Sequence, residues 1–150
     1  MTAKVFPIIP ASAKAMWVML PIAVFLVVLA FFLGFIAYST RNAKFEVVEG
    51  GLRIKGALYG RFISNGSFVK DGAKILNLDR ETDFQPRTRA NGIGLPGYSE
   101  GWFKLKNGEK ALLFLTDRTK VVYIPTKNGY SVLLSPKHPE EMLNWVGELL

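Results

Sequence analysis

The chain has 150 residues, no cysteine, one histidine and a formal net charge of +7 at pH 7. This length leaves room for one small domain beside a membrane segment. The missing cysteines exclude disulfide bonds, thiolate metal sites and cysteine nucleophiles. The basic residues are scattered rather than gathered in one helix or stripe, which argues against a nucleic-acid-binding protein.

The longest apolar run extends from Ala15 to Tyr38 and contains no charged residue. At about 1.5 Å per residue, a helix of this length extends roughly 36 Å and crosses a hydrocarbon core of about 30 Å. The run is longer than the apolar region of a signal peptide and no A-x-A cleavage site follows it, so we expect a retained anchor. We predict a short basic arm over residues 1–14, a single transmembrane helix over 15–38 and a linker over 39–44.

The charges that flank the apolar run give only a small preference for one orientation. Lys4, Lys14 and the amino terminus lie before it, whereas several basic residues follow it within about 20 residues. Because loops rich in lysine and arginine stay in the cytoplasm, the count leans slightly towards a cytoplasmic domain.

After the apolar run, the pattern changes to the alternation of apolar and polar residues that is typical of β-strands. Residues 45–47 and 52–55 alternate in this way, and the pair Gly50-Gly51 between them is typical of a two-residue hairpin turn. Further short strands are predicted at residues 62–63 and 74–78.

The second half of the chain combines an irregular stretch, a strongly β-forming stretch and a helix. Residues 80–100 are rich in glycine and proline with little periodicity, so we predict a long loop with room for one brief strand. Strands punctuated by turn residues then follow over 101–134, and we predict that they form an antiparallel meander. A C-terminal amphipathic helix is predicted from apolar residues at helical spacing, namely Met142, Trp145, Val146 and Leu149.

Three segments resemble bacterial pleckstrin-homology-like (PH-like) domains: residues 89–98 (RANGIGLPGY), 101–108 (GWFKLKNG) and 133–136 (LLSP). The resemblance covers about residues 45–150. It implies a mainly β domain, in which a curved antiparallel sheet of about seven strands is capped by one C-terminal α-helix. Such domains often follow transmembrane helices, so the resemblance also implies a single-pass protein of the bacterial cell (inner) membrane. It implies a role in binding and not a reaction.

Several motif-like patterns fail the structural requirements of the sites that they mimic. Residues 92–97 spell G-x-G-x-x-G, but a β pattern follows and Pro96 disrupts a helix start, so a dinucleotide site is not expected. The alternating carboxylates of residues 79–83 lack the glycine and the last carboxylate of a calcium-binding EF-hand. His138 has no serine and carboxylate arranged as a triad. We therefore predict no catalytic residue, no cofactor and no metal site.

The candidate ligand-binding residues are basic and aromatic side chains around the predicted long loop, namely Arg87, Arg89, Tyr98, Trp102, Lys104 and Lys106. If the loop folds over the strand of Trp102, these groups share one neighbourhood that suits an anionic headgroup or an acidic peptide. The alternative is that Tyr98 and Trp102 belong to the core and that the charges form a solvated rim.

We expect a membrane-anchored PH-like adaptor that binds a protein partner or an anionic lipid headgroup next to the bilayer, and not a nucleic acid. A second hypothesis is a structural or regulatory subunit of a larger membrane complex that associates through its transmembrane helix. A membrane-tethered hydrolase is the hypothesis of another class, and the single histidine argues against it.

Overall fold

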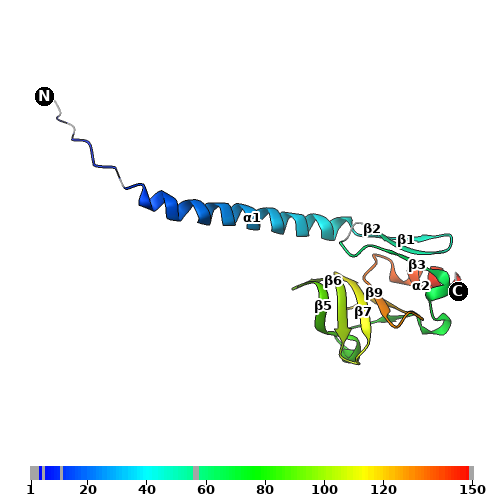
Figure 1. Cartoon of the computed structure of the whole chain (residues 1–150). Coiled ribbons are helices and arrows are strands. Elements are labelled where there is room, and N and C mark those ends of the chain that lie inside the picture. The colour runs from blue at the N-terminus through cyan, green and yellow to red at the C-terminus, as the bar shows by residue number, and fades with distance from the viewer. Residues whose placement is uncertain (1–3, 5, 11, 56–57, 149–150) are drawn as a thin grey trace. The chain divides into compact units, whose positions relative to one another are not determined.

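The computed structural model describes residues 4, 6–10, 12–55 and 58–148 (Figure 1). The chain divides into two compact units, Met1–Tyr38 and Ser39–Leu150. Helix α1, Lys14–Asn42, makes up most of the first unit and continues through much of the predicted linker. Only Ala43 lies between this helix and the first strand.

Helix α1 has the character of a membrane-spanning helix. Its stretch Met16–Tyr38 has a mean hydropathy of 2.9 and is long and apolar enough to cross a membrane. Large apolar side chains such as Phe25 and Phe31 are exposed, which is costly in water and favourable in lipid.

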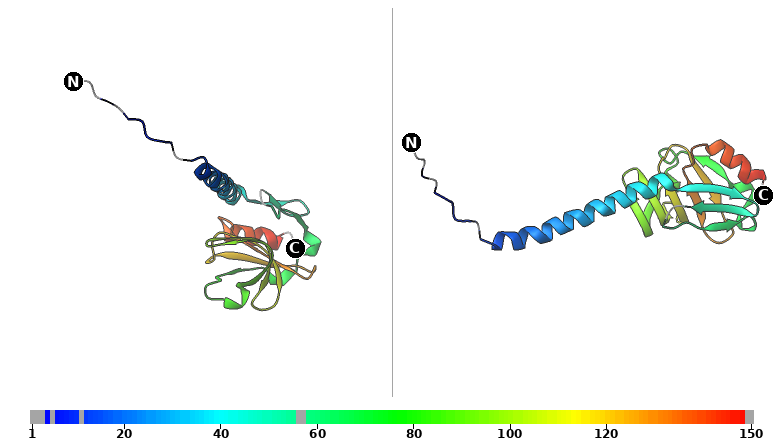
Figure 2. Two further views of the ribbon diagram at one scale, coloured as in Figure 1. Left: turned by 60° about the vertical axis from the view of Figure 1, so that its left-hand side comes forward. Right: turned by 90° about the horizontal axis from the view of Figure 1, so that it is seen from above.

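The described part of the second unit is mainly β, as predicted, and holds nine strands in two sheets (Figures 1 and 2). The first sheet is antiparallel, has the order β1-β2-β3 and consists of β1 (Lys44–Val48), β2 (Gly51–Lys55) and β3 (Phe62–Ser64). The second sheet has the order β4-β8-β9-β7-β6-β5. Its strands are β4 (Lys74–Leu76), β5 (Pro86–Leu95), β6 (Tyr98–Leu105), β7 (Lys110–Leu115), β8 (Val121–Pro125) and β9 (Ser131–Leu134).

One strand pairing differs from the predicted meander. Strand β9 lies between β7 and β8 and pairs with β7 in parallel, with Leu112 opposite Val132 and Leu113 opposite Leu133. The other pairings of both sheets are antiparallel. The turn residues before β8 predict that the chain reverses, and it does. The turn residues do not indicate which strands become neighbours in the sheet. Burial of the apolar side chains decides that order.

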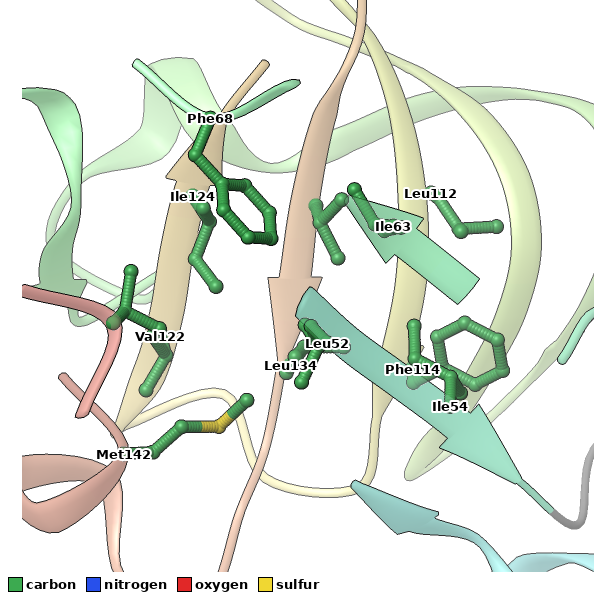
Figure 3. Packing of buried hydrophobic residues seen from close by; sticks show 12 residues of the cluster. Leu52, Ile54, Ile63, Phe68, Leu112, Phe114, Val122, Ile124, Leu134 and Met142 are labelled. Atoms are coloured by element: carbon green, nitrogen blue, oxygen red, sulfur yellow. The ribbon is translucent and has the colours of Figure 1, made fainter. Parts of the chain in front are cut away.

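The second sheet buries both of its faces, and this produces two cores. On one face, Leu112 and Leu134 pack against Leu52 of β2 and Met142 of the C-terminal helix (Figure 3). On the other face, Leu133 and its neighbours pack among side chains of the same sheet. Consecutive residues of β9 therefore belong to different cores, because side chains of a strand alternate between faces.

The C-terminal helix α2, Pro139–Glu148, closes the first core and confirms the predicted amphipathic helix (Figure 2). Its buried residues include Met142 and Val146, at the helical spacing that the sequence shows. The helix contacts β4 and β8. Leu149, which is predicted to extend the apolar face, lies outside the described residues.

The predicted long loop over residues 80–100 is instead mostly a hairpin of β5 and β6. Strand β5 is an edge strand whose residues are largely exposed, so its sequence lacks the apolar alternation that reveals a half-buried strand. Two register shifts bend it, between Pro86 and Thr88 and between Arg89 and Asn91.

Glycine allows the two backbones of this hairpin to approach closely. Gly101 has a φ of +107°, and a Cβ atom placed on it would lie 2.6 Å from the carbonyl oxygen of Asn91. Gly108, in the turn after β6, has a φ of +92° but open space around it. Any other residue would have a strained backbone at either position, but only at Gly101 does a Cβ atom also lack space.

We predict that Gly101→Ala destabilises the protein by about 2 kcal/mol more than Gly108→Ala, because only the first adds an overpacking cost. Urea titration of the full chain in detergent micelles measures the free energy of unfolding of both variants. Equal losses for the two variants would contradict the close backbone approach.

Candidate ligand-binding site

The register of β6 divides the predicted ligand-binding residues between two faces of the second sheet. Trp102 and Lys104 share the face of Leu112, which the first sheet covers. Arg89 is paired with Phe103 and therefore lies on the opposite face.

The remaining predicted residues also lie apart from Trp102. Arg87 is exposed at a register shift of β5. Lys106 follows β6, and its Nζ atom donates a hydrogen bond of 2.7 Å to Oε1 of Gln85. Tyr98 is buried at the start of β6. The structure therefore does not bring the whole predicted set into one site.

Trp102 is instead surrounded by cations that sequence analysis did not connect with it. The guanidinium carbon of Arg61 lies 4.8 Å from the centre of its ring system, and Nζ of Lys110 lies 4.6 Å from it. The ring of Tyr130 meets it edge to face, with 5.0 Å between ring centres. Lys104 is the cross-strand neighbour of Lys110. We call Arg61, Trp102, Lys104, Lys110 and Tyr130 the Trp102 cluster.

The cations of the Trp102 cluster form no ion pair with a carboxylate of the described residues. The ion pairs within the described ranges are Lys55–Glu46, Arg118–Asp79 and Lys120–Glu140, and none includes a residue of the cluster. The electron-rich face of Trp102 attracts the cations but carries no net charge. The cluster therefore gathers three cations beside a half-buried aromatic ring, an arrangement that attracts anions.

A buried carboxylate anchors the segment that leads to Arg61. Glu100 is fully buried on β6 and accepts hydrogen bonds from the Tyr98 hydroxyl and from the backbone N–H of Tyr59, the latter at 3.2 Å. The Tyr59 hydroxyl also donates to Oδ1 of Asn91 at 2.8 Å. These bonds fix the segment before β3 against the β5–β6 hairpin, and the backbone N–H of Ile54 donates a hydrogen bond of 2.8 Å to the carbonyl oxygen of Arg61 itself.

Sequence analysis missed Glu100 because a glutamate in a strand is normally exposed. The available signal was its spacing: Glu100 stands between Tyr98 and Trp102 at alternate positions, which places all three on one face of the strand.

A second concave feature lies at the β1 edge of the first sheet. It is an open groove of about 780 Å³ between β1 and the segment that leads from β9 into α2. Its walls include Phe45, Phe114, Met142 and Trp145. His138, the single histidine of the chain, is exposed at its rim.

Comparison with protein-family models matches residues 43–148 to the bacterial PH domain family. Comparisons with curated proteins and with solved structures gave no match. The matched range includes the Trp102 cluster and the groove beside β1.

We predict that Glu100→Gln lowers the free energy of unfolding by about 1–3 kcal/mol, because it replaces one of two buried accepting oxygens with an NH2 group that cannot accept a hydrogen bond. Hydrogen exchange of the Tyr59 amide should become faster as its segment detaches from β6. Glu148→Gln, at an exposed site on α2, is the matched control and should change stability by less than about 0.5 kcal/mol. Unchanged stability and exchange in Glu100→Gln would show that Glu100 does not hold this segment.

Proposed function

The chain belongs to the bacterial PH domain family, and from this premise we propose that it is a binding module anchored in the bacterial cell membrane, not an enzyme. Helix α1 is the anchor, with residues 1–14 as a short arm before it and residues 45–150 as the PH-like domain after it. The ligand is the anionic headgroup of lipids in the same bilayer, and the Trp102 cluster receives it.

The anchor supports a ligand that belongs to the membrane itself. The connection between α1 and β1 is the single residue Ala43, which tethers the domain to the end of the helix. A domain tethered in this way meets lipid headgroups at a high effective concentration, so even a weak site is occupied.

The observation that carries the proposal is the group of cations around Trp102, none of which forms an ion pair with a described carboxylate. Arg61 and Lys110 lie within 4.8 Å and 4.6 Å of one aromatic ring and form no ion pair with a described carboxylate. Each basic residue near an anionic membrane surface contributes about 1 kcal/mol of attraction. Tryptophan suits such a site because its ring prefers the interface between headgroups and hydrocarbon.

The proposal changes the predicted ligand-binding set. It keeps Trp102 and Lys104 and adds Arg61, Lys110 and Tyr130. Arg87, Arg89, Tyr98 and Lys106 are left out because they lie outside the cluster.

The side of the membrane is part of the proposal. The cytoplasmic leaflet carries the anionic lipids, and the domain side of α1 has more flanking lysine and arginine than the amino-terminal side. Both considerations favour a cytoplasmic domain.

We predict that anionic lipid shifts the indole N–H resonance of Trp102 in the isotope-labelled full chain. The protein is held in neutral phosphatidylcholine bicelles, phosphatidylglycerol is added, and Trp102→Phe identifies the resonance. The shift should saturate and weaken with added salt, because salt screens the attraction.

Removal of charge provides the matched comparison. Arg61→Gln with Lys110→Gln should weaken the response to phosphatidylglycerol roughly thirtyfold, since it removes about 2 kcal/mol of attraction. Arg87→Gln with Arg89→Gln removes the same charge outside the cluster and should have a much smaller effect. An equal loss in both variants, or an unmoved Trp102 resonance, would overturn the assignment of the site.

A further inference from the structure

The groove beside β1 is independent of the Trp102 cluster and has the features of a peptide-binding site. Strand β1 forms one wall, and the opposite wall is formed by residues 135–138 and the start of α2. β1 is an edge strand, because within the described ranges β2 is its sheet neighbour and no strand pairs with its other side.

The free edge of β1 offers main-chain hydrogen-bonding groups to this groove. The two-residue turn between the strands makes Val48 and Gly51 the first hydrogen-bonded pair of the ladder. Pairs alternate along an antiparallel ladder, so the N–H and C=O groups of Phe45 and Val47 point to the free edge. Their side chains pack against the core, as β-strand geometry requires.

Apolar side chains line the groove below that edge. The ring of Phe45 meets the ring of Phe114 edge to face, with 6.2 Å between ring centres. Met142 lies in the wall formed by α2, and Trp145 of the same helix is 55% exposed. A tryptophan that remains exposed beside an apolar groove is a typical anchor for a binding partner.

The charges at the groove favour an acidic occupant. Lys44 and Lys137 line it, and neither forms an ion pair with a described carboxylate. The hydrogen bond from Lys55 holds the pKa of Glu46 below its usual value, and the two charges, 2.7 Å apart, neutralise each other. Glu141 is the other carboxylate that lines the groove, and it forms no ion pair with a described residue. Because Lys55 neutralises Glu46, the two lysines of the groove, Lys44 and Lys137, outnumber this one carboxylate.

We propose that this groove binds an extended acidic segment of a partner protein, which adds as a strand to the free edge of β1. Main-chain hydrogen bonds to Phe45 and Val47 supply affinity, and alternate apolar side chains of the segment enter the groove beside Trp145. Acidic side chains between them meet Lys44 and Lys137.

A second copy of this chain fits the same edge less well. A second copy carries the same surplus of cations, so Lys44 and Lys137 would meet like charges instead of the carboxylates that they attract. The edge therefore favours a different chain with the opposite charge.

The test selects the segment directly. A display library of random short peptides is panned against the full chain in phosphatidylcholine nanodiscs, with empty nanodiscs as the background. We expect enrichment of peptides that alternate apolar and acidic residues. The enriched peptide itself is then the probe, labelled with a fluorophore and titrated with the protein by anisotropy.

Matched variants locate the binding. Trp145→Ala should weaken binding of the probe by about tenfold or more, whereas Phe62→Ala, which removes a similarly exposed ring on the far edge of the first sheet, should not. Val47→Pro removes the main-chain donor at the free edge and should weaken binding about fivefold while leaving the β1–β2 ladder intact. Circular dichroism confirms that each variant is folded.

Three results would overturn the proposal. The first is a library that yields no peptide above the background. The second is a probe whose affinity is the same for the parent protein, Trp145→Ala and Val47→Pro. The third is a protein that is dimeric in nanodiscs and becomes monomeric in Val47→Pro, which would assign the edge to a second copy.

Discussion

Burial of β7, β8 and β9 on both faces is the constraint on which the rest of the domain depends. Each of these strands sends alternate side chains into two different cores, so both faces of the second sheet must be covered. The first sheet and α2 cover one face, and on the other face Leu78 and Phe84, from the segment between β4 and β5, pack against side chains of the sheet. The parallel pairing of β7 with β9 follows from this demand, because it places the most apolar strands at the centre.

The two proposed binding features lie where the first sheet and α2 cease to cover the second sheet. Trp102 lies on the covered face of β6 near the edge of the sheet, half-buried, so its ring is supported by the core and still reached by Arg61 and Lys110. Strand β1 covers the core with its side chains while its outer main-chain groups remain unpaired. Glu100 connects the second sheet to the first, because on β6 it accepts a hydrogen bond from the segment that leads from β2 to β3. One core thus supports both proposed sites, the one for an anionic group and the one for an extended segment.

The local sequence pattern predicted the individual helices and strands of this protein better than it predicted which of them lie next to one another. The apolar run, the β1–β2 hairpin and α2 follow from periodicity and turn residues, although the hairpin turn is Glu49-Gly50 and not the predicted Gly50-Gly51. The resemblance over residues 45–150 implied the fold class that the structure confirms. Strand β5 was missed because an exposed edge strand needs no apolar alternation. The candidate set combined residues close in sequence, but alternation along β6 separates Arg89 from Trp102, and the cations over the ring come from distant segments, β7 and the approach to β3.

The central claim is that the domain lies beside the anionic, cytoplasmic leaflet. A measurement of the side of the membrane on which the domain lies tests this claim most directly. The chain has no cysteine, so Asn128→Cys in the exposed turn between β8 and β9 gives a single thiol. A membrane-impermeant maleimide should fail to label this thiol in intact cells and should label it after lysis. Labelling in intact cells would place the domain outside the cytoplasm and contradict the account.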